Sequence, residues 1–183
     1  MFQQLFNTAR RRNRSIADGL YAQIVAAARQ PAFYSDWEVP DTPLGRYEMV
    51  GLHLYLALRR LRGEGAGADA LAQELTDTFF LDMDHSLREL GIGDMGIPKR
   101  MKKLARMFYG RAKSYDEALD AADAAGLAAA LARNVMPEAS DWAHAPKLAK
   151  YLQDASAELA SQRIDSLLAG QIAFPSVAEG SEA

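Results

Sequence analysis

FFLDMDHSLRELGIGDMGIPKRMKKLARMFYGR, residues 79–111, decides the fold because it contains two helical patterns separated by a short turn. Gly91 and Gly93 can adopt the left-handed backbone geometry that ends a helix, and Pro98 suits the first turn of the next helix. The helix before the turn is acidic, and the helix after it is strongly basic. The sequence therefore predicts a helical hairpin whose two arms carry opposite charge.

The rest of the chain also has the pattern of an α-helical protein. Alanine, leucine, glutamate and arginine are abundant, and no run alternates with a period of two for long enough to indicate a strand. Helices are expected at about 15–30, 42–62, 69–90, 98–113, 114–133 and 146–168. The prediction is an all-α, single-domain bundle of about six helices with irregular loops.

Local signals place the ends of these segments. Pro40 and Pro43 argue against a helix in the aromatic loop around residues 33–37. The run SYDE at 114–117 has the pattern of a capping box, which starts a new helix. The expected organisation is a basic amphipathic segment at 1–14, a helical domain at 15–169 and a disordered tail at 170–183.

Composition excludes several classes of protein. The chain has 183 residues, a net charge of −3 and no cysteine, so disulfides and thiol catalysis are excluded and DNA is not an expected partner. No apolar run approaches the roughly 20 residues that span a bilayer, and the N-terminus lacks the apolar core of a secretory signal. The expected location is the cytoplasm, with peripheral contact at the inner face of the cytoplasmic membrane.

The N-terminal segment has the pattern of a membrane-surface helix. Apolar residues would line one side and arginines would cluster at its end, where they attract anionic lipids. The alternative is a helix start that packs on the core. The residues expected to contact the membrane are Phe2, Leu5, Phe6, Arg10, Arg11 and Arg12.

The basic helix gathers its cations on one face. If the helix is regular, these cations lie within about 100° of one another, opposite an apolar stripe. Such a face suits an anionic partner, which could be ribosomal RNA, an acidic protein surface or lipid head groups, whereas the plain alternative is a solvated surface. The cations are Lys99, Lys102, Lys103, Arg106 and Lys113.

Evidence for catalysis is weak. Asp82, Asp84, His85 and Glu89 form the only cluster with metal-ligand chemistry, but the chain has no Glu-x-x-His pair of the kind that helical carboxylate-metal sites use. Asp84 and Arg88 also have the spacing of a surface ion pair. We therefore expect no cofactor, no metal and no catalytic residue, and a carboxylate metalloenzyme is the least favoured alternative.

The hairpin motif resembles the ubiquinol–cytochrome c chaperone family. The similarity rests on FFLDMD at 79–84, LRE at 87–89, GIGD at 91–94, PKRMKK at 98–103 and FYGR at 108–111. It continues into YD at 115–116 and AL at 118–119, and upstream through Tyr34 and the 43–62 helix. It covers about two thirds of the chain and little of either terminus.

This resemblance implies an all-helical assembly factor for respiratory complex III. Members of the family bind newly made cytochrome b, and in mitochondria they act with a small partner subunit near the ribosomal tunnel exit. The resemblance implies nascent cytochrome b as the client, the ribosome near its exit as a further contact, and no catalytic centre. The short chain without a long targeting extension favours a bacterial-type member. The oligomeric state is left open.

The hairpin is the expected client-binding surface. Phe80, Leu81 and Tyr109 lie outside the buried stripes of their helices, so they either face the client or pack on a neighbouring helix. Opposite charges on the two arms are expected to fix the angle between them, and Asp94 is expected to cap the basic helix. The charged residues assigned to this surface are Asp82, Asp84, Arg88, Asp94, Lys99, Lys102, Lys103, Arg106 and Arg111.

Overall fold

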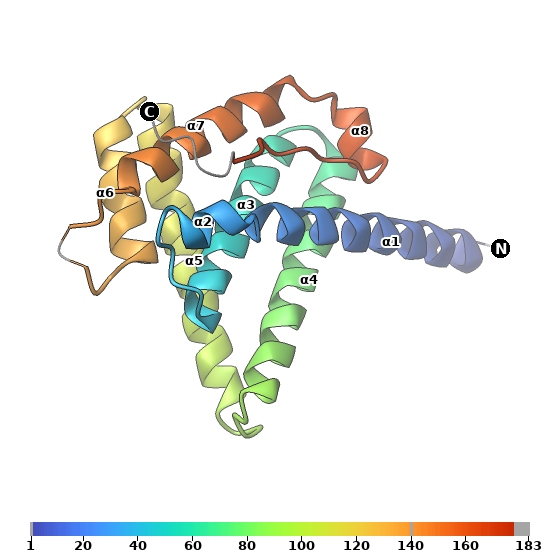
Figure 1. Cartoon of the computed structure of the whole chain (residues 1–183). Coiled ribbons are helices and arrows are strands. Elements are labelled where there is room, and N and C mark those ends of the chain that lie inside the picture. Colours follow the sequence, from blue (N-terminus) through green and yellow to red (C-terminus); the bar gives the residue numbers. More distant parts are fainter. Residues whose placement is uncertain (1, 140, 178–183) are drawn as a thin grey trace.

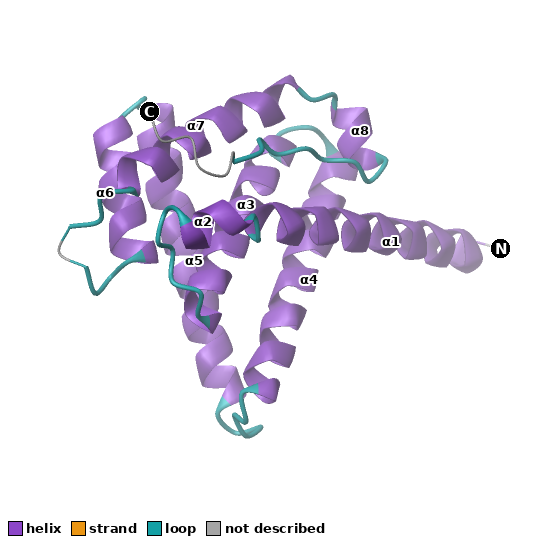
Figure 2. Cartoon of the chain, in the orientation of Figure 1, coloured by secondary structure: helices purple, strands orange, loops and turns teal. Residues whose placement is uncertain are grey.

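The computed structural model describes residues 2–139 and 141–177, with side chains from residue 13 onward. Eight helices and no strand are found in these ranges, so the all-α prediction is confirmed (Figure 2). Six of the helices are longer than five residues, in agreement with the expected number. The helices are α1 (Phe2–Ala28), α2 (Pro31–Ser35), α3 (Pro43–Leu61), α4 (Ala66–Glu89), α5 (Ile97–Asp120), α6 (Ala124–Val135), α7 (Ala145–Ser161) and α8 (Ile164–Leu168).

Helix α3 is the centre of the bundle and contacts α1, α4, α5, α6 and α7. Met49 and Leu56 lie on one side of the helix and Leu54 on the other, and all three are almost completely buried, as expected for a helix that is apolar nearly all round. The helix starts at Thr42, whose hydroxyl accepts a 3.1 Å hydrogen bond from the Gly45 amide. Its central position makes α3 the support for the other helices.

Helices α4 and α5 form the predicted hairpin, which projects from the body of the protein (Figure 1). Gly91 ends α4 with a φ of 78°, its amide bonds the Arg88 carbonyl at 2.9 Å, and the Ile92 amide bonds the Leu87 carbonyl at 3.2 Å. These are the two bonds of a Schellman motif. Pro98 lies in the first turn of α5. Local sequence signals therefore place this turn correctly.

The expected helix start at residue 114 is wrong, because α5 continues without interruption to Asp120. The Ser114 hydroxyl donates to the Gly110 carbonyl one turn earlier, at 3.3 Å, instead of capping a new helix. The break comes at Asp123, whose carboxylate accepts a 2.8 Å hydrogen bond from the Gly126 amide at the start of α6. Burial of Tyr115 within α5 outweighs the local capping signal.

Two further segments differ from expectation. The aromatic loop contains a one-turn helix, α2, because Pro31 occupies the first turn and Phe33 is fully buried. The predicted helix at 146–168 is divided into α7 and α8, since Gln162 adopts an extended backbone with ψ of 137°. Its side chain bonds both the amide and the carbonyl of Ala173, at 3.0 and 2.7 Å. A tertiary contact thus ends α7.

Residues 170–177, which we call the strap, lie across α1 and pack on the core, whereas the sequence indicated a disordered tail from Gly170. Gln23 donates to the Gly170 carbonyl at 2.8 Å and accepts from the Ile172 amide at 3.1 Å. Ile172 is buried, and the Phe174 ring lies 5.2 Å from the ring of His53. Residues 178–183 of the expected tail lie outside the described residues.

The first helix is longer than expected, because α1 runs unbroken from Phe2 to Ala28 and includes most of the segment predicted at 1–14. Its N-terminal half extends past the body (Figure 1). The side chains proposed to contact a membrane lie outside the described residues, so that contact stays a prediction. They are Phe2, Leu5, Phe6, Arg10, Arg11 and Arg12.

Candidate functional site

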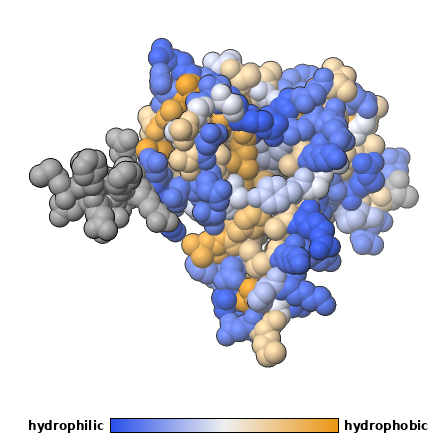
Figure 3. Space-filling model, turned by 180° about the vertical axis from the view of Figure 1, so that it is seen from behind, coloured by the Kyte–Doolittle hydropathy of each residue, from blue (hydrophilic) through white to orange (hydrophobic). Residues whose placement is uncertain are grey.

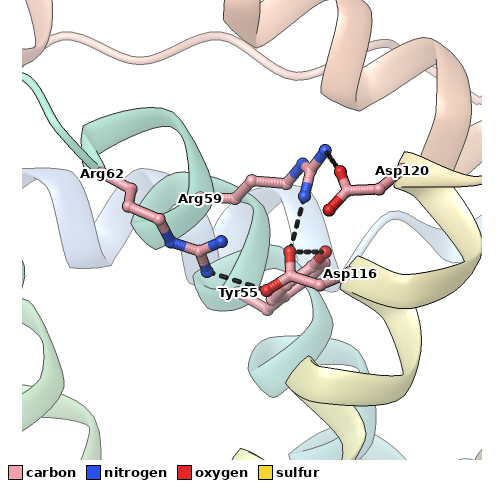
Figure 4. A network of polar contacts seen from close by, with 5 residues as sticks. All are labelled: Tyr55, Arg59, Arg62, Asp116 and Asp120. Atoms are coloured by element: carbon pink, nitrogen blue, oxygen red, sulfur yellow. Dashed lines mark hydrogen bonds and ion pairs between the residues drawn. The ribbon is translucent and has the colours of Figure 1, made fainter.

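A polar network attaches α5 to α3 at the base of the hairpin (Figure 4). Asp116 accepts hydrogen bonds from the Tyr55 hydroxyl at 2.7 Å, from Arg59 at 2.6 Å and from Arg62 at 2.9 Å. Arg59 also bonds Asp120 at 2.6 Å. One carboxylate therefore gathers three donors from the C-terminal half of α3 and the residue that follows it.

The network keeps Asp116 ionised. Partial burial alone would raise the pKa of this carboxyl, but the hydrogen bonds from Arg62, Tyr55 and Arg59 outweigh that effect and lower the pKa. Hydrogen bonds to an ionised carboxylate are stronger than hydrogen bonds between neutral groups. The C-terminal half of α5 is therefore firmly held, whereas the N-terminal half projects.

Arg111 belongs to this attachment and is not a free surface cation. Its guanidinium lies 2.7 Å from the Glu48 carboxylate on α3, without the alignment of a hydrogen bond, and the Glu48 side chain is only 3% exposed. Burial raises the pKa of Glu48 to about 8, and the charge of Arg111 opposes that rise. The expected pairing of Arg111 with the acidic arm is therefore wrong.

The acids of the hairpin bind partners other than the expected basic arm. Asp82 accepts a 2.8 Å hydrogen bond from Tyr21 on α1. Arg88 bonds Asp84 at 2.7 Å within the same helix and also pairs with Asp94. The cross-hairpin ion pairs are thus a wrong prediction, because neighbours on the same helix and on α1 are closer.

Asp94 does not cap α5 either. The capping position is occupied by Gly96, and no side chain there accepts a hydrogen bond from the backbone. Two residues separate Asp94 from the first helical residue, Ile97, and its carboxylate turns back toward Arg88. The role of Asp94 is to join the turn to the end of α4.

The predicted basic face of α5 is present. Lys99, Lys102, Lys103 and Arg106 are exposed, and none pairs with a carboxylate in the described part of the chain. Lys113 differs, since it lies 3.8 Å from Glu117. Four cations are thus available to a partner, and their part in binding stays a prediction.

Apolar side chains on the hairpin fall into two groups. Tyr109 is 57% exposed and Leu81 is 45% exposed, so both are accessible to a partner. Phe80 is half-buried, with its ring 6.1 Å from the ring of Phe108 and 6.4 Å from the ring of Tyr109. Seen from behind, the hairpin has a hydrophobic area bordered by hydrophilic side chains (Figure 3). Phe80 is chiefly a support for the exposed Tyr109.

Tyr109 also lines a hollow that sequence patterns did not reveal. This hollow has a volume of about 280 Å³ and lies between α3, α4 and α5. The lining residues come from three helices, so the sequence held no direct sign of the hollow apart from the expected exposure of Tyr109. The lining residues are Leu58, Leu61, Arg62, Asp69, Ala72, Gln73, Thr76 and Tyr109.

The described residues offer little for metal chemistry. No three histidine or acidic side chains among them gather in a way that could hold a metal ion. Asp82 and Asp84 are already engaged by Tyr21 and Arg88, as described above. Within the same ranges, no helix is both long enough and apolar enough to cross a bilayer.

A family model described as ubiquinol-cytochrome C chaperone matches residues 35–174. The chain belongs to this family. The resemblance noted in the hairpin motif is thereby confirmed. The match includes the hairpin, the hollow and most of the strap, and it leaves out α1.

Individual chaperone relatives agree with this assignment. The crystal structure of the Cbp3 homolog from Brucella abortus is 54% identical, with a TM-score of 0.87, over 96% of this chain and 97% of the other. Ubiquinol-cytochrome-c reductase complex assembly factor 1 from Xenopus laevis is 25% identical over 67% of this chain and 60% of its own length. The human protein of that name is 25% identical over 87% of this chain and 54% of its own length. The chain therefore spans between half and two thirds of these assembly factors.

Proposed function

We propose that this chain is an assembly chaperone for ubiquinol–cytochrome c reductase that binds newly synthesised cytochrome b. The observation that carries the proposal is the family match over residues 35–174, which includes every element of the candidate surface. The names of the assembly factors from frog and human support the same process. The proposed activity of the chain is binding of a client protein, without a chemical reaction.

The hairpin and the hollow provide the proposed client surface. Tyr109 and Leu81 are exposed apolar groups, and the hollow beside Tyr109 can receive a side chain from the client. Lys102 and Arg106 are exposed cations on the same helix as Tyr109. Apolar contact would cover part of a membrane protein before insertion, and charge would set its orientation.

Crosslinking tests the client and the surface together. A photo-crosslinking residue at position 109 should capture cytochrome b in growing cells, whereas the same residue at exposed position 147 on α7 should not. Capture of diverse membrane proteins by position 109 would contradict a dedicated chaperone.

Loss of the gene should lower assembled complex III while other respiratory complexes persist, and an unchanged level would contradict the assembly role.

The four unpaired cations on the predicted basic face of α5 support one other candidate, a ribosome- or RNA-binding module that acts near the tunnel exit. Binding through several phosphates should weaken steeply between about 50 and 200 mM salt. Reversal of Lys102 and Lys103 to glutamate should then abolish binding to ribosomes. Ribosome binding that is insensitive to both changes would exclude this use of the basic face.

A further inference from the structure

The turn is the end of the hairpin that lies farthest from the body (Figure 1), and it carries exposed large apolar side chains. Met95 is 99% exposed and Leu90 is 58% exposed, more than any other large hydrophobic side chain in the described part of the chain. Neither contributes to the core, and exposing them to water is unfavourable. The turn therefore presents an apolar end that the fold itself does not need.

Positive charge lies behind this apolar end on the α5 side, whereas the end of α4 carries acids such as Glu89. From Leu90 to Arg106 the sequence has five cations and one acid, Asp94, although the whole chain has a net charge of −3. Asp94 shares the Arg88 guanidinium with Asp84. The cations nearest the turn, Lys99 and Arg100, are exposed and pair with no carboxylate among the described residues. The local surface is thus apolar at its extremity and basic behind it.

The arrangement of apolar side chains at the end and cations behind them distinguishes among anionic partners. Single-stranded RNA would be bound by cations with stacking aromatic side chains, yet residues 90–106 include no aromatic residue. An anionic bilayer instead accepts apolar side chains below its phosphates and attracts cations at their level. We infer that the turn of the α4–α5 hairpin is a membrane-surface anchor, in which Leu90 and Met95 enter an anionic bilayer while Lys99, Arg100 and Lys103 bind lipid phosphates.

The shape of the turn is fixed in advance of binding. A Cβ atom at Gly96 would lie 2.8 Å from the Arg100 guanidinium and 3.2 Å from the Ile92 side chain, so the turn packs closely at this glycine. Ile97 behind it is buried. A hollow of about 540 Å³ opens between residues 91–96 and Arg100, which leaves space for a phosphate beside the guanidinium. Little conformational freedom is lost on binding, because the Schellman motif already holds the backbone.

This anchor has a different centre from both surfaces considered so far, although Lys99 and Lys103 were also among the charged residues expected on the client surface. It lies on a different element from the N-terminal arginines, and it uses the turn, whereas the proposed client surface uses Tyr109 and the hollow. The inference does not depend on the identity of the client, and its test contains no client. A hairpin that touches the bilayer at its turn would leave Tyr109 roughly 18 Å farther along α5, outside the bilayer.

The absence of cysteine permits a direct test with the full chain, since one introduced cysteine is a unique labelling site. Met95→Cys with an environment-sensitive dye should show a blue shift with vesicles of phosphatidylcholine and phosphatidylglycerol, and none with phosphatidylcholine alone. The control is Leu44→Cys on α3, where the side chain is 48% exposed, and it should not shift. A shift of similar size at both positions would overturn the anchor.

Vesicle flotation tests the two kinds of contact separately. Leu90→Ser with Met95→Ser should lower the fraction bound to anionic vesicles about tenfold, because both inserted side chains are lost. Lys103→Ser should lower the partition coefficient about fivefold, and Lys147→Ser on α7 should leave it unchanged. Circular dichroism confirms that each variant is folded.

Three results would overturn the inference. The first is equal binding to neutral and anionic vesicles. The second is vesicle binding that survives the turn variants and is lost when Arg10, Arg11 and Arg12 are replaced by serine, which would assign the contact to the N-terminus. The third is salt-sensitive binding of the full chain to RNA without binding to vesicles, which would assign the cations to nucleic acid.

Discussion

Glu48 of α3 and Arg111 of α5 meet at 2.7 Å at a buried position, where α5 is attached to α3. Replacing Arg111 leaves the buried Glu48 carboxyl without its polar partner, which costs about 1–3 kcal/mol. We therefore expect Arg111→Met to destabilise the fold far more than Arg106→Met, which alters an exposed cation of the same helix. Thermal unfolding of the two variants measures the difference.

Stability should fall as the pH rises from about 6.5 to 8. Burial raises the pKa of Glu48 to about 8, so the folded chain binds a proton here that the unfolded chain has already lost. Burial lowers the pKa of His53 to about 4, which makes stability rise between pH 4 and 6.5 and opposes Glu48 in that lower window. Glu48→Gln should remove the decline above pH 6.5. A decline that is unchanged in this variant would show that another group causes it.

His53 should depend on the hydroxyl of Tyr151. The Nδ1 atom lies 2.7 Å from the Met49 carbonyl, which can only accept, so Nδ1 carries the proton and Nε2 accepts from Tyr151 at 2.8 Å. Tyr151→Phe leaves a fully buried acceptor without its donor and should cost about 1–3 kcal/mol. Tyr109→Phe is the control, since Tyr109 is exposed. Equal denaturation midpoints for the two variants would contradict this hydrogen bond.

Asp116 should matter more than Asp120, although both accept hydrogen bonds from Arg59. Asp116→Ala removes the common acceptor of Tyr55, Arg59 and Arg62 and should cost about 2–3 kcal/mol. Asp120 is 65% exposed, so Asp120→Ala should cost no more than about 1 kcal/mol. Urea denaturation followed by circular dichroism compares the two. Similar losses would mean that the exposed pair carries the attachment.

Asp94 and Asp123 provide a matched test of capping. Asp123 accepts from the Gly126 amide, so Asp123→Ala should cost about 1 kcal/mol. Asp94 makes an exposed ion pair without capping α5, so Asp94→Ala should cost less than that, and added salt should reduce the loss further. A salt-independent loss on replacing Asp94 would indicate a backbone role that the structure does not show.

Local patterns predicted the hairpin well because its signals are local. Gly91 supplies the positive φ at the end of α4, and Pro98 fits the first turn of α5, whatever the rest of the chain does. The SYDE run failed for the opposite reason. Its serine and glutamate favour a helix start, but Tyr115 and Asp116 are held from outside by α3 and α6. Contacts between distant residues decided that boundary.

In the candidate site, too, features set by local sequence were predicted and features set by distant residues were not. The helical wheel correctly placed Lys99, Lys102 and Arg106 on an exposed face, since exposure follows from the position of the apolar stripe. Arg111 was misassigned although it lies three residues after Phe108 and four before Tyr115, which puts it beside that stripe. Its partner, Glu48, is 63 residues away in the sequence, and no local sequence pattern indicates that these two residues form a pair. The hollow was missed because three helices contribute to it.

The strap shows that side-chain amides can take the place of neighbouring peptide groups. Each carboxamide directs one N–H donor and its carbonyl oxygen at the strap, in nearly the geometry of a backbone unit, so a row of them offers the strap what an adjacent strand would offer. Gln30 bonds the Pro175 carbonyl at 3.1 Å and the Val177 amide at 2.7 Å, as Gln23 does for Gly170 and Ile172. An extended segment is thus accommodated in an all-helical protein without a sheet. Because these bonds involve only main-chain atoms of the strap, side chains at exposed positions such as Ala173 can be replaced without losing them. Glutamate in place of either glutamine would keep the hydrogen-bond acceptor and lose the donor.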